Sequence, residues 1–299
     1  MNVDATTTIR VLTACSLAGL LLGVGLRLRL TDVRDALRRS RMGWMMVANF
    51  VAVPALVLGL ARALHLSRDV TIGMILLGAA PFAPVVPVFT RMAKGDLALA
   101  AGLTALFPFL AAPLTPFVCE LCLKAVPEAK TLVFKPLTVL LVLASTITLP
   151  LGIGVAVNHW FPAVARRMCR PIEVLSEAAG LVSLVFVTVV EFESAIAIGW
   201  KALVAMAVAG ELSLWLGYAL GGPGVAARLV TALGSSNRNI ALAVLVALDS
   251  FPDTPVTGAV VANGLWLIIL GLINVGFWRF CRSRAVDASE LQGFSGGGQ

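Results

Sequence analysis

The stretch Leu233-Gly234-Ser235-Ser236-Asn237-Arg238-Asn239-Ile240-Ala241-Leu242-Ala243 decides the fold of this chain. It lies in an apolar segment from about Val225 to Leu248, which is long enough to cross a bilayer as a helix. Its centre is polar, and polar groups at that depth must face protein or a wet cavity. An arginine at the bilayer centre costs roughly 2.5–3.5 kcal/mol on insertion scales, so Arg238 is a candidate functional residue. The alternative is that Arg238 snorkels to an interface or pairs structurally.

The composition is that of a multi-pass integral membrane protein. The chain has 299 residues, of which 59% are hydrophobic and 13% are charged, whereas soluble domains carry roughly 25% charged residues. The net charge of +7 sits in short loops, where it sets orientation and does not indicate nucleic-acid binding. Cys119 and Cys122 lack a second pair or a histidine cluster, so no metal site and no cofactor is expected. Motifs of metalloenzymes and serine hydrolases are missing, and no enzymatic activity is expected.

Nine apolar segments are expected to cross the membrane as helices, at about residues 9–26, 43–60, 69–91, 96–119, 136–157, 172–192, 200–220, 225–248 and 255–280. Charged loops are expected at 120–135 and around Arg166, Arg167 and Arg170, and a disordered tail at 282–299. The third segment contains Pro81, Pro84 and Pro87, which cannot all continue a regular helix because each removes a donor and clashes with the preceding turn. We therefore expect two helices broken within the membrane, the third and the eighth.

The basic residues predict the orientation. With the N-terminus outside and the C-terminus in the cytoplasm, 15 of the 23 Lys and Arg residues fall in inside loops and 7 in outside loops, with Arg238 left over. This bias predicts a bacterial-type inner (plasma) membrane protein. Its most basic loop, 27–41, is expected to contact lipid headgroups.

The spacing of the two broken segments predicts an inverted repeat. They are five membrane spans apart, and an odd number of spans means that the two segments run through the membrane in opposite directions. Interrupted helices at matched positions of oppositely oriented halves are typical of secondary transporters. Residues 1–120 and 172–281 would form the two halves of one transporter domain, and residues 132–157 the linking helix. The breaks, at Pro81 to Pro87 and Gly234 to Asn239, should cross near the midplane.

The residues also resemble those of a known family. The run Gly78-Ala-Ala-Pro81-Phe-Ala-Pro-Val-Val-Pro-Val-Phe-Thr90-Arg-Met-Ala-Lys94-Gly95-Asp96 resembles the crossover of the bile acid:sodium symporter family. Pro113-Leu-Thr-Pro116, Asn239-Ile-Ala-Leu-Ala243 and Gly25-Leu-Arg-Leu-Arg-Leu-Thr-Asp32 also fit its pattern. The resemblance implies a core domain of helices 2, 3, 4, 7, 8 and 9, a panel domain of helices 1, 5 and 6, and a substrate crevice between them.

The departures from that pattern concern sodium. The resemblance places Val86, Pro87, Ala100, Gly234 and Arg238 where the family has oxygen-bearing sodium ligands. Thr104 is retained, and Asn49 replaces a glutamine. Because valine, proline and alanine side chains offer no oxygen and Arg238 is a fixed cation, sodium coupling at the usual sites is not expected.

The leading hypothesis is a secondary transporter of a small organic anion, bile-acid-like or another carboxylate. The expected substrate-binding residues are Arg238, Asn239, Asn237, Ser235, Ser236, Asn49 and Thr104. Positive half-helix N-termini would assist them. Two alternatives stay open. One is a sodium symporter with relocated ligands, for which Glu191, Glu193 and Glu211 are the acidic candidates. The other is a non-transporting membrane receptor or scaffold with the same fold.

Overall fold

The computed structural model describes residues 3–127 and 134–295, and over these residues the chain is helical without a β-strand. Seven helices are long and apolar enough to cross a membrane, so the chain is a multi-pass membrane protein. Their candidate spans are Ala5–Arg27, Met42–Ala63, Leu97–Lys124, Pro136–Trp160, Pro162–Val190, Gly199–Leu220 and Val256–Phe280.

Two further apolar segments are interrupted. The first consists of α5 (Arg68–Gly78) and α6 (Val86–Met92), and the second of α13 (Val225–Ser236) and α14 (Ile240–Ser250). These are the third and eighth segments of the sequence pattern, so the prediction that both are broken is confirmed.

Two of the long spans contain a π-helical turn that precedes a proline. The second span is built from α3 (Met42–Val47), η1 (Ala48–Ala52) and α4 (Val53–Ala63), and the fourth from α8 (Pro136–Leu143), η3 (Ala144–Thr148) and α9 (Leu149–Trp160). Pro54 and Pro150 lack the N–H that would bond four residues back, and the widened turn relieves the clash of the ring. The turn in the second span holds Asn49.

Several expected loops are helical. Arg166, Arg167 and Arg170 lie within α10 (Pro162–Val190), where a loop was expected. Pro162 suits the first turn of a helix, and alanine, arginine and methionine propagate it, so the helix begins well before the apolar run. The basic segment after α1 (Val3–Arg27) forms the short helix α2 (Leu30–Arg39).

Helix α7 (Leu97–Lys124) likewise extends into the expected loop 120–135, and the pair Glu120–Lys124 stabilises its last turn at 2.7 Å. Residues 128–133 of that loop lie outside the described residues. The final helix, α15 (Val256–Ser295), continues through most of the segment expected to be a disordered tail, since Ala, Leu, Glu and Gln there favour a helix. Residues 296–299 lie outside the described residues.

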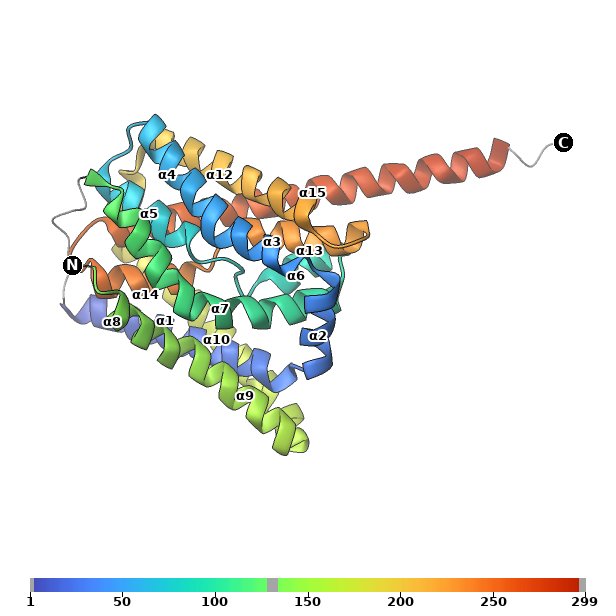
Figure 1. Cartoon of the computed structure of the whole chain (residues 1–299), viewed down its shortest axis with the longest axis horizontal. Coiled ribbons are helices and arrows are strands. Elements are labelled where there is room, and N and C mark those ends of the chain that lie inside the picture. The colour runs from blue at the N-terminus through green and yellow to red at the C-terminus, as the bar shows by residue number, and fades with distance from the viewer. Residues whose placement is uncertain (1–2, 128–133, 296–299) are drawn as a thin grey trace.

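Helices α1, α9 and α10 pack along one side of the molecule, with α4 and α12 (Gly199–Leu220) along the opposite side (Figure 1). Small and hydroxylic residues bring the first three together. A Cβ on Gly25 would lie 2.4 Å from the Leu151 carbonyl, and the hydroxyls of Thr13 and Ser183 lie 2.6 Å apart. Close packing and interhelical hydrogen bonds of this kind replace the hydrophobic effect within lipid.

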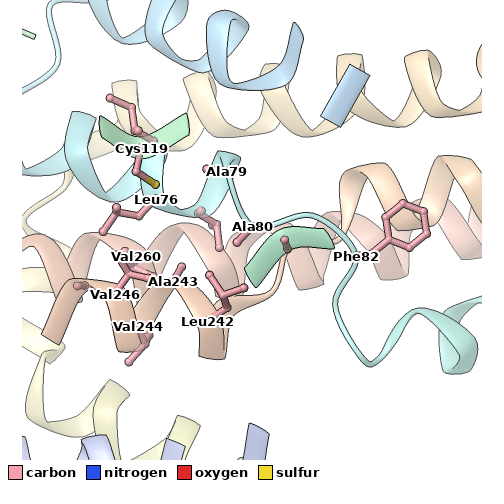
Figure 2. Close-up of a cluster of buried hydrophobic side chains, with 14 of the residues drawn as sticks. Leu76, Ala79, Ala80, Phe82, Cys119, Leu242, Ala243, Val244, Val246 and Val260 are labelled. Atoms are coloured by element: carbon pink, nitrogen blue, oxygen red, sulfur yellow. The ribbon is translucent and has the colours of Figure 1, made fainter. Parts of the chain in front are cut away.

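The core of the molecule surrounds the two interruptions. Figure 2 shows Ala79 and Ala80, after the end of α5, facing Leu242 and Ala243 at the start of α14. All four are fully buried. Alanines at these positions let the two chain segments approach closely, which sets up the crossing described below.

Candidate functional site

The two interrupted segments meet and bond to each other through their backbones. The Phe82 N–H donates to the Gly234 carbonyl at 3.2 Å, and the Ala83 N–H donates to the Asn237 carbonyl at 3.1 Å. In the other direction, the Asn239 N–H donates to the Ala80 carbonyl at 2.8 Å. These bonds satisfy backbone groups that helices would otherwise satisfy, as apolar surroundings require. The prediction that the breaks cross is confirmed.

The breaks differ in extent from their predicted bounds. Gly234, Ser235 and Ser236 still belong to α13, so the second interruption comprises only Asn237, Arg238 and Asn239. The polar side chains of the two serines do not break a helix, since Ser236 returns its hydroxyl to the Leu233 carbonyl at 3.3 Å.

The three prolines of the first break also differ in their placement. Pro81 pairs with Arg238 in an isolated antiparallel bridge, and Pro84 occupies the turn that leads into α6. Pro87 lies inside the first turn of α6, where a missing N–H costs nothing because that donor has no helical partner.

Gly234 is needed for the crossing because the ring of Phe82 lies against it. A Cβ at position 234 would come within 2.1 Å of the ring atom Cε1. The same ring stacks on Phe107 of α7 at a centroid distance of 3.9 Å, and Phe82 has a positive φ of 57°. The resemblance places a carboxylate ligand at position 234, and here the ring of Phe82 occupies the space that any side chain there would need.

Arg238 is buried at the crossing, with a relative exposure of 5%, and does not snorkel to an interface. Its Nη1 donates to the carbonyl of Gly78 at 3.1 Å. Gly78 is the last residue of α5, so the cation lies at the partially negative end of a half-helix dipole. Among the described residues, no ion pair joins Arg238 to a carboxylate, and its Nη2 has no hydrogen-bond partner.

A small void lies beside Arg238, between α4, α12 and α15. It measures about 10 Å³ and is also lined by Ser213 and Ser236. That volume is about the minimum for one water molecule and is far too small for a carboxylate. An organic anion cannot therefore reach the arginine from this side.

A much larger cavity lies on the other side of the crossing. It has a volume of about 440 Å³ and lies between the α1–α10 pair, the first break, α14 and α15. Asn237, Arg238 and Asn239 line one wall. The opposite wall is mostly apolar, with a few polar side chains: Thr13, Ser16, Glu177 and Ser183. Its size and mixed lining suit a drug-sized ligand.

The structure thus brings three of the seven expected binding residues into the cavity and leaves four outside its lining. Asn49 donates from Nδ2 to the hydroxyl of Ser235 at 3.1 Å, which ties the π-helical turn of the second span to α13. Thr104 and Ser236 are buried elsewhere in the core. Neither residue lines the large cavity, and the hydroxyl of Thr104 has no hydrogen-bond partner among the described residues.

The sequence reasoning missed Glu177. This carboxylate is near the middle of α10, and it shares one stripe of that helix with Gly180, Leu184 and Val187, all of which line the cavity. A carboxylate within an apolar span was a sufficient signal. None of the acidic residues that the sequence singled out lines the cavity, and Glu211 instead accepts from Asn274 at 2.6 Å.

Comparison with known proteins identifies the family. The profile of the Sodium Bile acid symporter family matches residues 14–199, which include the first break and end before the second. YocS of Bacillus subtilis (strain 168), described as an uncharacterized sodium-dependent transporter, is 26% identical over 170 residues. That match covers 56% of this chain and only about half of the relative's length, 50%. The chain belongs to the sodium bile acid symporter family.

Proposed function

We propose that this chain is a secondary transporter that moves a small organic anion by alternating access, with Arg238 serving as a built-in cation where relatives hold sodium. The observation that carries this proposal is the bond from Arg238 to the carbonyl of Gly78. A cation at the C-terminal end of a half-helix offsets the negative end of its dipole, which is the electrostatic task of a bound ion there.

The charge of Arg238 opposes a sodium ion at the same crossing. Two unit charges about 4 Å apart repel by roughly 4 kcal/mol at an effective dielectric near 20. That energy corresponds to about three decades of affinity. The neighbouring Gly234 offers no carboxylate to offset it, and the ring of Phe82 leaves no room for one.

The anion is expected to bind in the large cavity, where Asn237, Arg238 and Asn239 lie at the beginning of α14. The first turn of a helix has free N–H groups and the positive end of its dipole. The remaining lining is mainly apolar and would hold the body of the substrate. Alternating access would then move the α1, α9 and α10 unit relative to the helices that carry the crossing.

The same proposal includes nine membrane-spanning segments in an inverted repeat, made of the seven long spans and the two interrupted segments. Reporter fusions after Ser40 and Ser283 should read as cytoplasmic, and a fusion after Lys130 as external. A cytoplasmic reading at Lys130 would contradict both the orientation and the repeat.

The test is uptake by purified protein in proteoliposomes, with cholate and octanoate as labelled anions. Uptake should be unchanged when sodium is replaced with potassium or choline. Arg238→Gln should weaken anion binding and uptake, and Arg238→Lys should preserve them only in part, because an ammonium lacks the planar fork of the guanidinium. Sodium-dependent uptake, or full activity of Arg238→Gln, would contradict the proposal.

A second candidate is a sodium symporter with relocated ligands. Four buried side-chain oxygens have no hydrogen-bond partner among the described residues, those of Asn49, Thr90, Thr104 and Asn263. Oxygen atoms are the ligands that hard cations prefer. If uptake requires sodium, Thr104→Val and Asn263→Leu should raise the sodium concentration needed for half-maximal uptake. Binding of the anion without uptake would favour the receptor alternative.

A further inference from the structure

The two walls of the large cavity carry opposite charges. One wall has the cation Arg238 and the first turn of α14, and the other has the carboxylate of Glu177. Among the residues that line the cavity, these are the two charged side chains. No ion pair within 4.0 Å joins either of them to a described side chain.

The positive wall is equipped to receive an anionic group. Asn239 caps α14 by accepting from the Leu242 N–H at 3.1 Å, and its Nδ2 has no hydrogen-bond partner. Asn239 is 2% exposed, so this donor is unpaired in an otherwise closed environment. Ile240 and Ala241, the first two residues of α14, also line the cavity. Their N–H groups belong to the turn whose donors lack helical partners.

The negative wall has no basic residue to neutralise it. On α10, Glu173 lies one turn from Glu177 and is paired with Arg27 of α1. The other cation of α1 within its span, Arg10, donates to the Leu248 carbonyl at 2.7 Å and does not line the cavity. The parts of α1 and α14 that line the cavity contribute hydroxyl and apolar side chains only. Glu177 therefore lines the cavity as an exposed carboxylate with no ion pair among the described residues.

We propose that the solute bound in this cavity is an amphipathic zwitterion, with a carboxylate at the crossing, an ammonium group at Glu177 and an apolar body between them. This inference rests on the proposed transport function and narrows its substrate class. A plain organic anion would pair with the positive wall and leave Glu177, which is an exposed residue at the rim of the lining, without a counter-charge. A zwitterion pairs both charges and adds no net charge to the occupied cavity, so this class satisfies both walls without a co-bound cation or a proton on Glu177.

The bulk of the lining defines the body of the solute. The apolar lining of the cavity includes Leu17, Leu20, Leu184, Val187 and Ile268. The volume of about 440 Å³ admits a flexible or compact body of drug-like size. Hydrophilic amino acids of small size would leave most of this apolar surface unpaired.

The experiment compares matched ligands on the full-length purified protein. The probes are 4-aminobutanoate, 6-aminohexanoate and 8-aminooctanoate, together with butanoate, hexanoate, octanoate and octylamine. Binding is measured by calorimetry in nanodiscs for wild type, Glu177→Gln, Glu177→Asp and Arg238→Gln. Glu193→Gln serves as the control, since it makes the same charge change in the short helix α11 (Phe192–Ile196), outside the cavity.

In wild type, the best amino acid should bind at least about tenfold more tightly than the carboxylate of equal length. Glu177→Gln should abolish this preference, whereas Glu177→Asp and Glu193→Gln should retain it. Arg238→Gln should weaken the binding of both the amino acid and the carboxylate and leave the ratio of their affinities largely unchanged.

Three results would overturn the inference: equal or tighter binding of the plain carboxylate in wild type, an undiminished preference in Glu177→Gln, or no binding of any probe. If octanoate binds through Arg238 and 8-aminooctanoate binds no more tightly than octanoate, the zwitterion inference fails and the proposal of an anion transporter is retained. If no carboxylate binds or is transported, both fail. A role of Glu177 in proton transfer would appear as pH-dependent octanoate uptake that Glu177→Gln removes without any amine preference, and it would also overturn the inference.

Discussion

The two interrupted segments perform the same structural task with different residues. The first, residues 79–85, is apolar and owes its irregular backbone to proline, and it offers the crossing the N–H groups of Phe82 and Ala83 and the carbonyl of Ala80. The second, Asn237 to Asn239, is short and polar. Its Asn239 N–H donates to the Ala80 carbonyl, and its Arg238 Nη1 donates to the carbonyl of Gly78 at the end of α5. The first segment thus contributes backbone hydrogen bonds, and the second also contributes the charged side chain.

The beginnings of the two half-helices differ in the same way. Helix α14 has a side-chain cap, since Asn239 Oδ1 accepts from the Leu242 N–H, whereas α6 has none and relies on Pro87 in its first turn. Of the two segments, only the second presents a charged side chain to the cavity, because Ala83, Pro84, Val85 and Val88 of the first present apolar groups. The difference teaches that an apolar, proline-rich break suffices for the crossing and that the chemistry is concentrated in the other one.

The largest effect on stability is expected where the two segments are packed most tightly. Gly234→Ala places a methyl group against the ring of Phe82, and overpacking of this kind costs about 1–3 kcal/mol. We expect a value near the upper end, since Phe107 holds the ring from the other side. Unfolding titrations in detergent measure this loss of unfolding free energy.

The matched control is Gly59→Ala in α4, where an added Cβ meets no atom within 4 Å. That variant should be as stable as wild type or slightly more stable, because alanine favours a helix over glycine. Wild-type stability of Gly234→Ala would show that the crossing is not closely packed.

The next effect concerns the cap that only the second break has. Asn239→Ala removes the acceptor for the Leu242 N–H and should lower the unfolding free energy by about 1–2 kcal/mol. It should also weaken anion binding in the nanodisc assay. Asp96→Ala removes an equivalent cap from α7, where Asp96 Oδ1 accepts from the Leu99 N–H at 3.0 Å, and it should reduce stability alone. Equal loss of binding in both variants would argue against a special role of the second break.

A smaller effect should come from the hydroxyl groups that support each break. Thr115 donates to the Ala79 carbonyl of the first break at 2.7 Å, and Ser235 accepts from Asn49 beside the second. Thr115→Val should cost about 1 kcal/mol because the buried carbonyl loses its side-chain donor. Ser235→Ala should cost about 0.6 kcal/mol, since Asn49 Nδ2 keeps its bond to the Met45 carbonyl. A reversed order of the two losses would show that the second break depends more on side-chain support.

The smallest effect is expected at Pro87. This proline lies in the first turn of α6, where its missing N–H has no helical partner, so Pro87→Ala should change the unfolding free energy by less than about 0.5 kcal/mol. Thermal unfolding, with Gly59→Ala as reference, is a sufficient measurement. A loss above 1 kcal/mol would mean that proline stiffness, and not only the irregular backbone, maintains the first break.

The sequence by itself determined the membrane-spanning class, the two interrupted segments and the buried arginine. These features depend on local rules, because proline cannot continue a helix and polar groups in an apolar run require a partner. The same local reasoning ended helices too early, as at Arg166 and Glu120, because polar residues at the end of an apolar run often remain helical.

Only the tertiary structure decided which polar groups face the cavity and which support the core. Ser235 and Ser236 belong to the same polar cluster in the sequence as Asn239, yet Ser235 accepts from Asn49 of the second span and Ser236 bonds back to Leu233 of its own helix. Glu177 reaches the cavity because α10 turns one particular stripe toward the crossing. Gly78 accepts from Arg238 because α5 ends where α14 begins, 160 residues later in the chain. Such pairings arise from the packing of distant segments, which the spacing of residues along a single helix does not encode.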